Sequence, residues 1–103
     1  MDLKEVKEIS MKIREEYHKL EKKYHHSEWT IEEDALAFLT DAGIVGRLTM
    51  DNQGRWPSGN GEKLDEKIGE CVWWLAVLSE RMNLNFEECI KKFFDSKKKM
   101  IED

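Results

Sequence analysis

The sequence predicts an all-α fold, a bundle of four helices, and three observations lead to that prediction. Apolar residues recur at spacings of three and four along most of the chain, which is the period of amphipathic helices. The chain has one proline, and four of its six glycines fall between Gly54 and Gly69, so we expect one turn-rich loop at 51–61. Helix-capping patterns begin at Thr30 and Asn85. We therefore expect helices at about 3–25, 30–50, 62–82 and 86–101.

Length and composition fit one folded domain over residues 1–103. The formal net charge of −5 disfavours nucleic acid and anionic membranes as partners. The first residues form no apolar signal region and no stretch has the length of a membrane span, so we expect a cytoplasmic protein. Cys71 and Cys89 fall on apolar faces of expected helices, where they should be small buried hydrophobic residues in a reducing compartment.

The first expected helix is long and has a narrow apolar seam. Charged residues separate its apolar positions, which are Leu3, Val6, Ile9, Ile13, Tyr17, Leu20 and Tyr24. A seam of this width packs either against a helix of another subunit or over the core of a monomer, and the pattern leaves both open.

The second expected helix opens with a capping box, in which the Thr30 hydroxyl and the Glu33 carboxylate satisfy backbone N–H groups. Asp41 is exceptional in this helix, because its neighbours at three and four positions are all apolar (Ala37, Phe38, Ile44 and Val45). A carboxylate beside apolar surface is costly unless it is paired. We therefore expect Asp41 to have a partner.

The third expected helix is the element on which the others should pack. Its apolar stripe widens so far that its second half should be buried on more than one side; the stripe comprises Leu64, Ile68, Cys71, Val72, Trp73, Trp74, Leu75, Val77, Leu78 and Met82. Ser58 or Asn60 should cap its start. Asn85 and Glu88 should form a capping box at the start of the last helix.

Carboxylates on the second and third helices form a candidate site. Antiparallel packing would place Asp41 and Glu70 near the same level, and Glu66 lies one turn before Glu70 on the same face. Three carboxylates on facing helices suit a hard cation such as Mg²⁺. The ordinary alternative is an acidic first turn of a helix, solvated and without a ligand.

Three segments of the chain match motifs of a known family. Residues 40–45 read TDAGIV, residues 67–76 read KIGECVWWLA, and a turn reading MNLNFEEC follows at 82–89. They resemble the E-E-x-G-E-L motif, the E-L-G-D-V-L-W-Y-L-A motif and the following turn of the MazG-type nucleoside triphosphate pyrophosphohydrolases, relatives of the dimeric dUTPases and dCTPases. The resemblance covers about residues 29–99 and includes both motif glycines, Gly43 and Gly69.

The resemblance implies a core shared between subunits, as a homodimer or homotetramer. It also implies an enzyme that uses Mg²⁺ to split a nucleoside triphosphate into a monophosphate and pyrophosphate. Asp41, Glu70 and Glu66 would bind the metal and carry the catalysis. Lys92 and Lys99 align with positions that contact phosphates in the family, and we consider Trp29 a candidate to stack on the base.

This chain departs from the family at several acidic positions. Thr40 and Ile44 lack the carboxylates of the first motif, and Lys67 replaces a carboxylate of the second. Asp41 is retained, and Glu70 stands where the family has aspartate. A Lys67 ammonium between Asp41 and Glu70 would neutralise them as a metal cation would. The alternative to an enzyme is therefore a catalytically inactive helical oligomerisation module in which Lys67 replaces the metal.

Overall fold

The computed structural model describes residues 1–58 and 61–102, and over these residues the chain is all-α, with no strand. In this part of the chain the elements are α1 (Leu3–His25), α2 (Ile31–Asn52), α3 (Leu64–Arg81), α4 (Phe86–Lys97) and the short 3₁₀ helix η1 (Lys98–Ile101). The prediction of an all-α fold with four helices is confirmed. The expected last helix differs only in its final turn, which is 3₁₀ rather than α.

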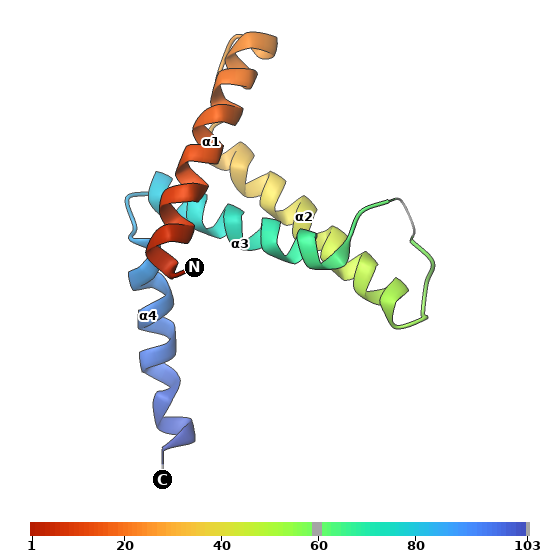
Figure 1. Cartoon of the computed structure of the whole chain (residues 1–103), viewed down its shortest axis with the longest axis vertical. Helices are drawn as coiled ribbons and strands as arrows, with labels where there is room; N and C mark the ends of the chain where they lie inside the picture. The colour runs from red at the N-terminus through yellow and green to blue at the C-terminus, as the bar shows by residue number, and fades with distance from the viewer. Residues whose placement is uncertain (59–60, 103) are drawn as a thin grey trace.

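The other three helices are arranged around α3 (Figure 1). α2 and α3 lie side by side as an antiparallel hairpin, α1 packs across α3, and α4 contacts both α1 and α3. α1 and α4 extend in opposite directions from the same end of the hairpin (Figure 1). The Cα radius of gyration is 16.3 Å, whereas a compact domain of about 100 residues has a radius of about 13 Å. The chain is therefore extended for its length.

Helix starts follow the capping signals, with one exception. The expected capping box of α2 is present: the Thr30 hydroxyl accepts from the Glu33 N–H at 3.1 Å, and the Glu33 carboxylate accepts from the Thr30 N–H at 2.9 Å. α3 begins after Lys63 without a side-chain cap. The expectation that Ser58 caps α3 is therefore wrong, and Asn60 lies outside the described residues.

The cap of α4 is shared between two elements. The Asn85 side chain accepts from the Glu88 N–H at 2.9 Å, which is half of the expected capping box. The N–H of Phe86 donates to Glu80 near the end of α3, also at 2.9 Å. The N-terminal N–H groups of α4 thus have two side-chain acceptors, one from Asn85 and one from the last turn of α3. The second of these links the start of α4 to the end of α3.

The buried hydrophobic core of the described residues is small. It consists of Leu48, Trp74, Ala76, Val77, Leu78 and Phe86, four of which belong to the second half of α3. The expected burial of that half is confirmed for these four residues, whereas Leu75 stays 45% exposed. Cys71 is half-buried, and Cys89 is exposed in an open groove between α3 and α4, so its predicted burial is wrong.

Candidate functional site

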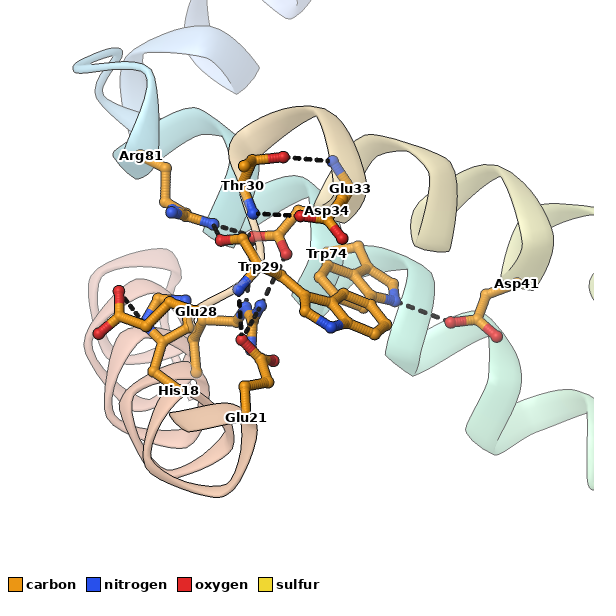
Figure 2. Close-up of polar contacts among 11 residues, drawn as sticks. His18, Glu21, Glu28, Trp29, Thr30, Glu33, Asp34, Asp41, Trp74 and Arg81 are labelled. Carbon is orange, nitrogen blue, oxygen red and sulfur yellow. Dashed lines mark hydrogen bonds and ion pairs between the residues drawn. The ribbon is translucent and has the colours of Figure 1, made fainter. Parts of the chain in front are cut away.

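The ammonium of Lys67 lies between the carboxylates of the two hairpin helices. Its Nζ is 3.2 Å from Asp41 on α2, 3.0 Å from Glu70 one turn along α3, and 3.4 Å from Glu62 before α3. The other Asp41 oxygen accepts a hydrogen bond from the Trp74 indole N–H at 2.7 Å (Figure 2). Asp41 thus has two partners, as its position among apolar residues requires. We call Asp41, Glu62, Lys67 and Glu70 the lysine cluster.

The two central charges of this cluster are largely shielded from water, since the Lys67 and Asp41 side chains are 12% and 14% exposed. The hydrogen bond with Glu70 raises the pKa of Lys67 above its usual value, burial opposes this, and Asp41 adds to the rise. Burial acts to raise the pKa of Asp41, but hydrogen bonds from Trp74 and Lys67 outweigh it and hold that pKa below the usual value. Both groups are therefore charged at neutral pH.

We expect the contribution of Asp41 to stability to disappear in acid. Its folded-state pKa lies below the unfolded value of about 3.9, so the ionised form stabilises the fold above about pH 4. This stability is lost as the pH falls through the folded-state pKa. Asp41→Asn should therefore destabilise the protein by about 1–3 kcal/mol at neutral pH, and by less at about pH 2.

Urea unfolding of both proteins at the two pH values measures this effect. Asp51→Asn at the exposed end of α2 is the matched control and should leave stability nearly unchanged at either pH. A loss of stability in Asp41→Asn that stays the same in acid would show that packing, not ionisation, is responsible.

These side chains do not fit a Mg²⁺ ion. Asp41 and Glu70 already bind an ammonium, whose positive charge would repel a second cation at the same point. Glu66 is exposed and lines an open surface pocket with Gly69 and Glu70, but among the described residues it does not pair with Lys67. Within residues 1–58 and 61–102, no group of three or more His, Cys, Asp or Glu side chains is placed to hold a metal.

The candidate substrate-binding residues are divided between two places. Trp29 lines a cavity of about 290 Å³ whose wall also includes Glu70 and the aromatic rings of Tyr17, Trp73 and Trp74. Lys92 and Lys99 are exposed on α4 and η1, which point away from the hairpin (Figure 1). The structure thus brings Trp29 near Glu70, and it does not bring the two lysines to the same site.

A second charged cluster joins α1, α2 and α3, and the sequence did not reveal it. Arg14 and Asp34 are 1% and 0% exposed and form a two-point ion pair, with N···O distances of 2.7 and 3.3 Å. Glu21 accepts from Arg14 at 2.7 Å, and Arg81 of α3 donates to Asp34, also at 2.7 Å (Figure 2). Burial opposes the charge of Arg14, but its bonds with Asp34 and Glu21 raise its pKa. We call these four residues the arginine cluster.

Because of the arginine cluster, the face of α1 that packs on the hairpin is not the apolar seam that the sequence predicts. The buried residues of α1 are the polar Ser10 and Arg14. The apolar seam expected to pack stays on the outside, with Ile9 and Ile13 each 42% exposed and Tyr17 50% exposed. The only sequence signal for this arrangement is that Ser10 and Arg14 lie four residues apart, on a face adjoining the seam.

Comparisons of this chain with protein-family models, with curated proteins and with solved structures give no match. The resemblance to MazG-type pyrophosphohydrolases therefore rests on the motifs and on the order of the helices. Over the described residues, none of the helices is both long enough and apolar enough to cross a membrane.

Proposed function

We propose that this chain is a catalytically inactive helical assembly module. It would be cytoplasmic and would function as a homodimer or homotetramer. The observation that carries the proposal is the position of the Lys67 ammonium, 3.2 Å from Asp41 and 3.0 Å from Glu70. The lysine provides from within the chain the positive charge that two facing carboxylates need. The contact between α2 and α3 is then stabilised without a metal, and the chain does not catalyse the Mg²⁺-dependent hydrolysis.

Exposed apolar surface supports the assembly part of this proposal. The core of the described residues has only six buried hydrophobic side chains, while apolar stripes on every helix stay open to water. Large exposed apolar patches on a small protein mark surfaces that other molecules cover. A module that functions by association presents such surfaces before it assembles.

Nucleotide binding, with or without hydrolysis, is the second candidate function. The observation in its favour is the cavity lined by Trp29, Trp73 and Trp74, whose rings offer flat surfaces to a base. The Glu70 carboxylate in the same wall disfavours an anionic triphosphate. The phosphate-binding lysines expected from the resemblance lie elsewhere, so we rank this function below assembly.

Exchanging the charge of Lys67 tests the proposal. We expect no Mg²⁺ binding to the wild type by calorimetry, with or without a non-hydrolysable nucleoside triphosphate. Lys67→Glu would put a carboxylate among Asp41, Glu62 and Glu70, and it should gain Mg²⁺ binding. Bound Mg²⁺ should then stabilise that variant by about 1.4 kcal/mol at a free concentration about ten times its Kd.

The control for this experiment is Lys63→Glu, which makes the same change of charge at the exposed residue before α3. It should bind no Mg²⁺. Nucleotide-dependent Mg²⁺ binding by the wild type, lost in Asp41→Ala, would establish the enzyme instead. A Lys67→Glu variant that folds and binds no Mg²⁺ would refute the idea that the lysine occupies a metal position.

A further inference from the structure

The cavity of about 290 Å³ lies between the two charged clusters. Arg14 and Glu21 of the arginine cluster belong to its wall, and so does Glu70 of the lysine cluster. The rest of the wall is mainly aromatic, with the side chains of Tyr17, Tyr24, Trp29, Trp73 and Trp74. A concave space with aromatic walls and a few charged groups is the usual form of a small-molecule site. We call this space the aromatic cavity.

Three rings of the aromatic cavity already bind cations of the chain itself. The guanidinium carbon of Arg14 is 5.9 Å from the ring centroid of Trp29 and 5.6 Å from that of Trp74, and Figure 2 shows both rings. The Lys23 ammonium is 5.3 Å from the ring centroid of Tyr24. At these distances a cation is attracted to the negative face of an aromatic ring. The wall therefore has the electronic character that binds cations.

Tyr17 and Trp73 are the two remaining rings, and their centroids are 5.7 Å apart. Over the described residues, no cation of the chain lies over either ring. Together with Glu70 they also line the open surface pocket that includes Glu66, which has a volume of about 340 Å³. Glu66 and Glu70 are one helical turn apart, about 6 Å along α3. The two rings are thus shared by adjoining spaces, and each space has a carboxylate in its wall.

The charges around these spaces favour a cationic ligand. The arginine cluster has two guanidinium groups and two carboxylates, so it is formally neutral. The lysine cluster has three carboxylates and one ammonium, a formal charge of −2. Lys67 lines neither the aromatic cavity nor the surface pocket, and the Glu70 side chain is 41% exposed. A cation can therefore approach Glu70 from the side of the cavity.

The kind of cation follows from the wall. Mg²⁺ requires several oxygen ligands around one point, which the aromatic wall does not supply. An organic ammonium ion requires less, namely one carboxylate and the face of a ring. An aliphatic chain attached to it can cover apolar surface, as the stem of a lysine side chain does. Two carboxylates with two rings between them suit a chain that has an ammonium group at each end.

We infer that the aromatic cavity and the adjoining surface pocket bind a linear aliphatic polyamine. One ammonium group would pair with Glu70 and another with Glu66, and the aliphatic chain would lie against Tyr17 and Trp73. This site adds a ligand to the proposed assembly module. It does not depend on the oligomeric state of the chain or on the absence of hydrolysis.

Fluorescence titration with spermidine, a linear triamine, tests the binding. Trp29, Trp73 and Trp74 belong to the wall, so a bound amine should change the tryptophan emission. We expect saturable binding with a Kd below about 1 mM, weakened by added salt because exposed ion pairs are screened. Butylamine has a single ammonium group and loses one ion pair, so it should bind about 2–5-fold more weakly than spermidine.

Matched variants test the position of the site. Tyr17→Leu removes a ring shared by both spaces and should weaken spermidine binding about 3–30-fold. Glu66→Gln should weaken it about 2–5-fold and leave the affinity for butylamine unchanged. The controls are Trp56→Leu, at a residue 55% exposed against 50% for Tyr17, and Glu16→Gln on the surface of α1. Neither residue lines the two spaces, so both controls should bind spermidine as the wild type does.

Four results would overturn the inference. The first is the absence of a saturable change up to about 10 mM spermidine. The second is equal weakening by Tyr17→Leu and Trp56→Leu, and the third is displacement of spermidine by an equal concentration of Mg²⁺, which would show attraction by charge alone. The fourth is tetramethylammonium binding as tightly as spermidine, which would place a single quaternary cation on the rings and leave Glu66 without a role.

The polyamine site and the proposed function can fail separately. Saturable binding of a non-hydrolysable nucleoside triphosphate, lost in Tyr17→Leu, would assign the cavity to a nucleotide and overturn both. Failure to bind spermidine would refute the site alone, because the Mg²⁺ titrations of Lys67→Glu concern a side chain that lines neither space.

Discussion

Arg14→Met should lower the free energy of unfolding by about 3 kcal/mol, because it removes one partner of a buried ion pair. Arg14 is 1% exposed, and it is bonded to Asp34, which is fully buried, and to Glu21. Methionine fills a similar space but cannot donate to either carboxylate. Arg81 still donates to Asp34 in the variant, which keeps the expected loss at the lower end of the range for broken buried pairs.

Lys19→Met on the same helix is the matched control. Lys19 pairs with Glu16 at the surface, where both side chains are more than half exposed, so its loss should leave stability nearly unchanged. Urea unfolding at one fixed protein concentration compares the three proteins, so that any association contributes equally to each measurement. Equal stabilities of Arg14→Met and Lys19→Met would mean that the arginine cluster does not hold α1 to the hairpin.

Trp74→Ala should cost about 3–5 kcal/mol, the range for truncating a buried aromatic side chain. Trp74 is 6% exposed at the interface of α2 and α3 and donates to Asp41 at 2.7 Å. Trp74→Phe keeps most of the ring and removes the donor, and it should cost about 1.5–3 kcal/mol, since the lost bond has a charged acceptor. The two variants thus separate packing from hydrogen bonding.

Trp56→Ala gives the reference for this pair of variants. Trp56 is 55% exposed and contacts Arg47 through its ring face, so truncating it should have a much smaller effect than truncating Trp74. Thermal and urea unfolding measure all three proteins. If Trp74→Phe were as stable as the wild type, the bond to Asp41 would contribute no net stability, and Lys67 alone would hold that carboxylate.

Local patterns predicted the helices well, because helix period and capping are properties of neighbouring residues. The start of α2 follows from Thr30 and Glu33, whose bonds are made within four residues. α3 was harder to place, since it begins after Lys63 without a side-chain cap and the sequence offered Ser58 and Asn60 instead. Without a local cap, the start of a helix is determined by tertiary packing, which a sequence pattern does not contain.

The candidate site could be predicted only in part. The need of Asp41 for a partner follows from its apolar neighbours, and Lys67 is the partner that the sequence offers in place of a metal. The pairing of Arg14 with Asp34 could not be foreseen, because it joins residues twenty positions apart on helices whose crossing is not encoded locally. For the same reason the apolar seam of α1 was visible in the sequence, whereas the turning of Ser10 and Arg14 toward the hairpin was not.

The lysine cluster also bears on how the fold responds to its surroundings. A dissociable cation would link folding to the concentration of free metal, so that chelation or depletion would loosen the hairpin. The ammonium of Lys67 is covalently attached to the chain and three residues from Glu70, so its local concentration is set by geometry and never diluted. If Lys67 replaces the metal as proposed, the hairpin should be equally stable in a chelator and in excess magnesium, as a constitutive structural unit would be.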